Sequence, residues 1–125
     1  MVMASVSGIL IGESLLADHP IDVPLRVRRI SRADVGDEKA GQPVRWTFIE
    51  FETELDSVEA LVDGLSGTLD PQGGWYCDFR SSHETFVVFS GQVFRYPRGD
   101  LVGRAKAEEH GRSVGVPEAQ LDWPE

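Results

Sequence analysis

The stretch Arg45–Glu54, RWTFIEFETE, has the most regular pattern in the chain, because its apolar and polar side chains alternate with a period of two. Such alternation is typical of a β-strand that has one face against a core. One face carries Trp46, Phe48, Glu50 and Glu52, and the other carries Thr47, Ile49, Phe51 and Thr53. If the first face points inward, its glutamates form a buried acid–base site; if it points outward, its aromatics form a binding surface. A third possibility is that a helix covers the aromatic side chains of this face while its glutamates reach solvent at the end of the strand.

Four other segments also have the pattern of strands. In chain order they are Val6–Leu16, Leu25–Arg32, Trp75–Arg80 and Thr85–Tyr96. Gly91 in the last of them indicates a bulge or a tight turn. The polar segment 33–43, which is bracketed by two glycines, predicts a loop between two strands.

Two segments have the spacing of helices. In the first, Asp56 is a candidate N-cap with Glu59 three residues later, and apolar residues recur at helical spacing as far as Leu69. In the second, Asp100 caps a helix that runs to about Val114. The order βββαββα predicts an α+β fold: one domain over residues 1–125, with a single curved, mainly antiparallel sheet of about five strands and two helices on one face. In the tail, we expect Leu121 and Trp123 to pack back on the domain.

The composition limits the class of protein. The chain has 125 residues, of which 41% are hydrophobic and 26% are charged, with a formal net charge of −9. This balance argues against nucleic acid or an anionic membrane as the partner, because both require a basic surface. There is no apolar run near the ~18 residues that cross a bilayer, and the first 24 residues contain no Lys or Arg, which makes them a poor signal peptide. We therefore expect a cytoplasmic protein. The excess of Arg over Lys and the absence of Asn suggest a GC-rich, bacterial genome.

The acidic residues are concentrated in one part of the chain. Residues 46–72 carry seven acidic side chains and no basic one, whereas residues 25–45 carry six basic and three acidic side chains. An acidic patch of this kind can attract a basic protein, although it can also be a solvated surface. The arginines at positions 26, 28, 29 and 32 are expected to pair with Glu50, Glu52 and Glu54 across a neighbouring strand. Strand alternation places Arg26 and Arg28 on one face and Arg29 on the other.

The segment WYCDFRSSHE, residues 75–84, holds the densest group of reactive side chains. Alternation directs Cys77 toward the core, where it is a small buried hydrophobe rather than a nucleophile. Tyr76, Asp78 and Arg80 share the other face and can line a pocket, with Asp78 as a general base and Arg80 holding an anionic group. They can equally form a solvent-facing surface. His83 falls in the turn that follows.

Familiar cofactor and metal patterns are missing from the sequence. There is no phosphate-binding glycine pattern, and the three histidines are too far apart to suggest a metal site. No cofactor and no metal are therefore expected. The chain resembles no family by its motifs.

Two functional hypotheses follow, and whether the protein is an enzyme stays open. The favoured one is a binding or accessory protein whose acidic, aromatic face engages another, basic protein; its binding residues are Trp46, Glu50, Glu52, Glu59 and Arg80. The alternative is a small-molecule pocket or small enzyme, with Asp78, His83, Glu50 and Tyr96 as candidate catalytic groups. A concave cavity that contains two of Glu50, Asp78, Arg80, His83 and Tyr96 favours the pocket, whereas a flat acidic face with an exposed Trp46 favours the protein partner. Both allow a homodimer through the Thr85–Tyr96 edge.

Overall fold

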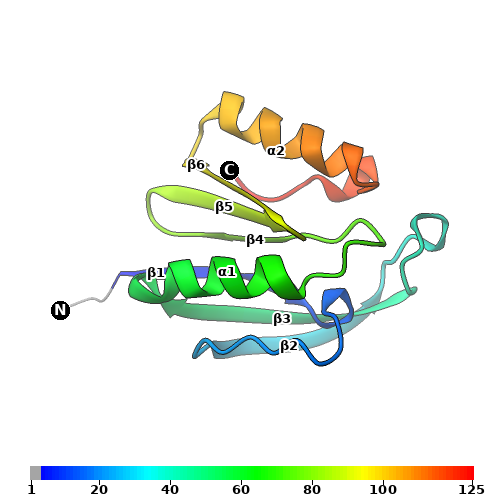
Figure 1. Ribbon diagram of the computed structural model, residues 1–125, viewed down its shortest axis with the longest axis horizontal. Helices are drawn as coiled ribbons and strands as arrows, with labels where there is room; N and C mark the ends of the chain where they lie inside the picture. The colour runs from blue at the N-terminus through cyan, green and yellow to red at the C-terminus, as the bar shows by residue number, and fades with distance from the viewer. Residues whose placement is uncertain (1–3) are drawn as a thin grey trace.

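The computed structural model describes residues 4–125 and contains one six-stranded antiparallel sheet and two α-helices (Figure 1). The strand order is β2-β3-β1-β4-β5-β6, so β2 and β6 form the edges. The elements are β1 (Ser5–Ile11), β2 (Arg26–Asp34), β3 (Arg45–Glu54), α1 (Val58–Thr68), β4 (Cys77–Arg80), β5 (Glu84–Phe89), β6 (Gln92–Pro97) and α2 (Leu101–Ser113). The predicted α+β fold is confirmed. Neither helix combines the length and apolar character that crossing a bilayer requires.

Several boundaries differ from the prediction for local reasons. The predicted strand Thr85–Tyr96 is a hairpin, since Gly91 adopts a positive φ of 72° in a tight turn between β5 and β6. The first strand ends at Ile11, because the Ser14 hydroxyl donates to the Ile11 carbonyl at 2.6 Å and closes a 3₁₀ turn. The predicted Asp56 cap is wrong, because Asp56 lies inside another 3₁₀ turn that precedes α1.

The two helices pack on opposite faces of the sheet, which corrects the prediction of one shared face. Alternate residues of β5 show this directly: Phe86 and Val88 belong to the core beneath α1, whereas Val87 and Phe89 belong to the core beneath α2. A strand that is covered on both sides has apolar residues in succession instead of in alternation. The run Thr85–Phe89, TFVVF, has this character, and every residue in it is buried.

The face beneath α1 forms the larger core. Phe79 lies at its centre, with ring centroids 5.1 Å from Phe86 and 6.2 Å from Phe51. Cys77 is buried there as predicted. The remaining buried members are Val6, Leu10, Val58, Leu61, Val62, Leu65, Leu69 and Val88. The apolar stripe of α1 therefore closes this face of the sheet.

The second core lies beneath α2 and the C-terminal segment. The Asp100 carboxylate accepts from the backbone N–H groups of Val102 and Gly103, so the predicted cap is confirmed. Gly111 allows α2 to approach closely, since a Cβ at this position would lie 2.8 Å from Leu121. Leu121 and Trp123 are buried, as expected for a tail that packs on the domain.

The arginines of β2 pair with the glutamates of β3, as predicted. Arg26 and Arg28 lie 2.7 and 2.6 Å from Glu52, and Arg29 lies 3.7 Å from Glu50. A register shift between Val27 and Arg29 places Arg29 on the same face as Arg26, which corrects the predicted split. Most of the acidic face of β3 is therefore next to positive charge.

Candidate functional site

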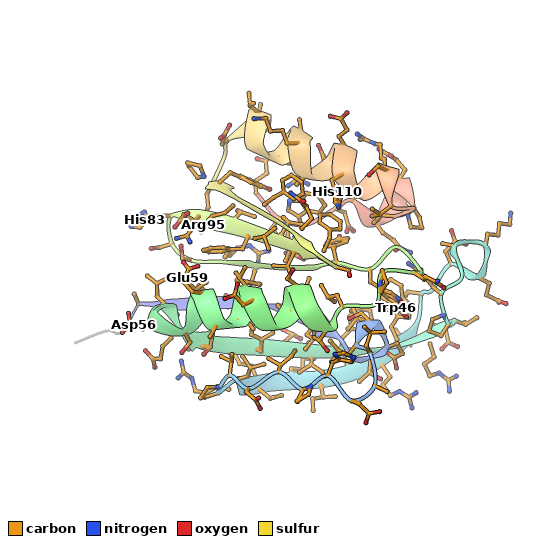
Figure 2. All side chains as sticks on the ribbon, viewed as in Figure 1. Trp46, Asp56, Glu59, His83, Arg95 and His110 are labelled. Carbon is orange, nitrogen blue, oxygen red and sulfur yellow. The ribbon has the colours of Figure 1, made fainter. Side chains whose placement is uncertain are left out.

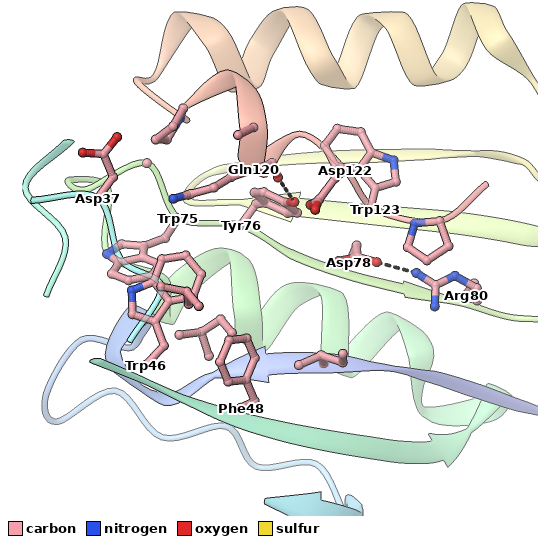
Figure 3. Close-up of a pocket in the computed structure, with 17 residues that line it drawn as sticks. Asp37, Trp46, Phe48, Trp75, Tyr76, Asp78, Arg80, Gln120, Asp122 and Trp123 are labelled. Carbon is pink, nitrogen blue, oxygen red and sulfur yellow. Dashed lines mark hydrogen bonds and ion pairs between the residues drawn. The ribbon is translucent and has the colours of Figure 1, made fainter. Parts of the chain in front are cut away.

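A cavity of about 660 Å³ lies on the face of the sheet opposite α1. Residues of β1, β3 and β4 form its floor, and the C-terminal segment 117–124 forms one wall (Figure 3). The connections 35–37 and 74–76 complete the lining. Its volume falls within the range of about 300–1,000 Å³ that is usual for small-molecule pockets.

Strand alternation places the floor residues. In β1, Leu10 points into the core beneath α1, and Ile9 and Ile11 point into the cavity. Ile9 is opposite Glu50 of β3 on one side and Asp78 of β4 on the other. Because α2 and the tail cover only the β4–β6 half of this face, Ile9 remains 44% exposed. The cavity therefore occupies the place where cover by the second layer ends.

Aromatic side chains dominate the walls. The Trp46 ring lies 5.1 Å from Trp75 and 6.0 Å from Phe48, centroid to centroid. Tyr76 and Trp123 make an edge contact at 5.2 Å on the other side. All three tryptophans of the chain line the cavity. Trp46 is only 9% exposed, and its Nε1 donates to the Pro43 carbonyl at 3.0 Å.

Hydrogen bonds hold the C-terminal wall in place. The Tyr76 hydroxyl donates to the Gln120 carbonyl (Figure 3), and the Gln42 Nε2 atom donates to the Gln120 side chain at 2.9 Å. Trp123 Nε1 donates to the Tyr96 hydroxyl at 2.7 Å. The Trp123 carbonyl accepts from Arg104 of α2 at 2.7 Å. This wall is consequently fixed to the loop before β3, to the connection before β4, to β6 and to α2.

One ion pair, between Asp78 and Arg80, lies in the cavity. Both side chains are mostly buried, with 18% and 19% of their surfaces exposed, and Arg80 donates to Asp78. Burial raises the pKa of the Asp78 carboxyl, and Arg80 only partly offsets that effect. Within residues 4–125, the buried Arg80 Nε has no hydrogen-bond partner. The pair thus places one titratable carboxyl, that of Asp78, and one guanidinium in the cavity.

The structure brings together only part of the predicted site. Trp46, Asp78 and Arg80 line the cavity, and Trp46 is buried rather than exposed. Glu50 and Glu52 lie on the same face of the sheet but outside the lining, where arginines of β2 hold them.

The other candidate residues lie elsewhere. Glu59 is on α1, on the opposite face, 2.7 Å from Arg95 (Figure 2). His83 is exposed in the turn between β4 and β5, at the opposite end of the molecule from Trp46 (Figure 2). Tyr96 is buried beneath α2, where its hydroxyl accepts a hydrogen bond from Trp123 Nε1.

Sequence reasoning did not identify Ile9, Asp37 or Asp122 as lining residues. The spacing of Leu121 and Trp123 was the available signal for Asp122, because a tail that buries alternate residues must lie extended along the domain. Nothing comparable marks Asp37, which follows an ordinary strand in a polar connection.

Comparison of the chain with protein-family models, with curated proteins and with solved structures found no match. The geometry of the cavity therefore carries the functional argument.

Proposed function

We propose that this protein binds a small molecule in the cavity between the sheet and its C-terminal segment. The observation that supports the proposal best is the position of Asp78 and Arg80 within a concave, aromatic-walled space of about 660 Å³. Ligand pockets typically combine apolar walls with a few polar groups that orient the ligand. The exposed Ile9 and half-buried Phe48 supply further apolar surface there.

The energetics of the ion pair also support a binding role. Removing two charges from water carries a desolvation penalty that apolar residues of similar size avoid. The Asp78–Arg80 pair lies among aromatic rings, whereas apolar side chains pack around Phe79 in the core beneath α1. Contact with a ligand would explain why this costly ion pair is present in the cavity. We also propose a cytoplasmic location, with which the single buried thiol of Cys77 is compatible.

The alternative function, an acidic face that engages a basic protein, has weaker support. It relied on Glu50, Glu52 and Glu59, and each of these carboxylates lies within 4 Å of an arginine nitrogen. Such pairing lowers the local field that would attract a basic partner. Homodimerisation through the β6 edge is compatible with either function.

The first experiment measures binding of a fragment library to the full chain by saturation-transfer NMR, with cationic, neutral and anionic fragments in equal number. The variant Ile9→Trp fills the cavity from β1. Ile30→Trp is the matched control, because Ile30 lies on β2, is 63% exposed and does not line the cavity. We expect fragments that bind the wild type and Ile30→Trp but not Ile9→Trp. Fragments that bind all three chains equally, or an absence of hits, would contradict the proposal.

A poly-lysine peptide tests the alternative. If the acidic face is the binding site, the peptide binds in low salt, and the triple change Glu50→Gln, Glu52→Gln and Glu59→Gln weakens it. Ile9→Trp then has no effect on the peptide. Circular dichroism of each variant verifies that it is folded.

A further inference from the structure

We infer that the ligand of this cavity carries a positive charge beside an apolar or aromatic body, as in an arylalkyl ammonium ion. The inference rests on the proposed function and adds the chemical class of the ligand. It comes from the charges of the lining, from its aromatic rings and from the state of its single guanidinium.

The lining is negatively charged. It contains the carboxylates of Asp37, Asp78 and Asp122 against one guanidinium, that of Arg80. Arg80 is already paired with Asp78. None of the salt bridges among residues 4–125 includes Asp37 or Asp122. The Asp37 Oδ1 atom accepts from the Lys39 N–H at 2.9 Å, which leaves its second oxygen and the Asp122 carboxylate available to a cation. Carboxylates beside low-dielectric walls attract positive charge more strongly than they do in open solvent.

The aromatic walls favour the same charge. A cation is attracted to the face of an aromatic ring, and by more when the site is shielded from water. This protein already uses the interaction at the edge of the cavity, since the Arg104 guanidinium lies 4.8 Å from the Trp123 ring centroid without itself lining the cavity. Trp46, Trp75 and Phe48 form a group of three rings in contact at the other end of the cavity. These rings offer their faces to the charged group of the ligand and apolar surface to the rest of the ligand.

An anionic ligand fits the lining less well. It would have to compete with Asp78 for Arg80 and would lie in the repulsive field of Asp122. The lining therefore suits a cation better than an anion.

Three probes of one shape test the charge preference: phenethylammonium, 2-phenylethanol and phenylacetate. Tryptophan fluorescence reports on the cavity, because all three tryptophans line it, and calorimetry provides an independent affinity. We expect phenethylammonium to bind about tenfold more tightly than the alcohol, which is the order of one cation–π contact, and phenylacetate to bind most weakly.

Asp122→Asn tests the origin of the preference. Asp122 is exposed, so its substitution is compatible with folding. We expect a loss of about three- to tenfold in phenethylammonium affinity, with no change for the alcohol. The matched control is Asp56→Asn, which changes the net charge equally at an exposed position outside the cavity.

The outcomes separate the inference from the function on which it rests. If the alcohol binds as tightly as the ammonium, and Ile9→Trp abolishes both, the cavity binds ligands but the charge inference is wrong. The inference is also wrong if phenylacetate binds most tightly, or if Asp122→Asn and Asp56→Asn have equal effects. If neither these probes nor any library fragment binds, the proposed function fails as well.

Discussion

The two faces of the sheet use the same strands and the same alternation, yet one is closed and the other is open. Beneath α1, the inward residues of β1 are almost fully buried, as Val6 and Leu10 show. Ile9, one residue before Leu10 in β1, faces the other side and is 44% exposed. The sheet itself therefore does not decide where a cavity forms.

The covering layer decides it. α1 follows β3 directly and lies over the middle of the sheet, whereas α2 follows the edge strand β6 and lies over that side (Figure 1). The C-terminal segment extends this cover toward β4, because the Tyr76 hydroxyl, just before that strand, donates to the Gln120 carbonyl. A cavity remains between that segment and the uncovered β1 and β3. A closed face therefore contributes stability, and an incompletely covered face provides a site.

The largest expected effect tests this division with two phenylalanines. Phe79 is completely buried beneath α1, and Phe48 is partly exposed in the cavity. We expect Phe79→Ala to lower the free energy of unfolding by about 3–5 kcal/mol, and Phe48→Ala by less than about half of that, because a cavity already adjoins its ring. Urea denaturation at neutral pH measures both values. Similar losses would mean that the open face contributes to stability as much as the closed one.

The second prediction concerns the C-terminal segment 117–124, the wall of the cavity on the side of α2. Tyr96→Phe removes the acceptor of the Trp123 Nε1–H, which is buried. We expect a loss of about 1–3 kcal/mol in the free energy of unfolding, because a buried donor is left without a partner. A double-mutant cycle with Trp123→Phe isolates the interaction. If Tyr96→Phe is as destabilising in the Trp123→Phe background as in the wild type, the hydrogen bond is not what holds the wall.

Local pattern was sufficient to predict the class of fold. The alternation of Arg45–Glu54, the Asp100 cap and the buried tail residues all appear as expected. The assignment of both helices to one face failed because it depends on long-range packing. The sequence feature that indicated helices on both faces was the apolar run Phe86–Phe89 of β5, whose successive residues are buried on opposite sides of the sheet.

The candidate site was only partly predictable for a similar reason. Asp78 and Arg80 could be placed on one face because they are two residues apart on one strand. The neighbours that make this face a cavity, among them Trp46, Trp75 and Trp123, come from distant segments whose meeting depends on tertiary structure. The number of acidic residues in segment 46–72 overstated the negative charge of this surface, because the arginines that pair with Glu50 and Glu52 come from β2.

The smallest expected effect concerns the Asp78–Arg80 pair, the feature that most distinguishes the open face from the closed one. Burial raises the pKa of Asp78 in the folded protein, and Arg80 opposes that rise. As the pH increases from about 4, the carboxyl ionises first in the unfolded chain, which favours unfolding until the folded carboxyl has ionised too. We therefore expect the stability of the wild type, relative to Asp78→Asn, to fall with rising pH and then to level off.

Urea denaturation of both chains across this pH range measures that difference. We expect this change in the free energy of unfolding to be smaller than the effects of Phe79→Ala and Tyr96→Phe, because Arg80 offsets part of the cost of burying the Asp78 charge. A relative stability that rises with pH would show that attraction to Arg80 outweighs burial, as at the surface pairs of β2 and β3. In that case the cavity would be as well solvated as the exposed arginine–glutamate ladder, and the physical distinction between the site and the rest of the open face would be lost.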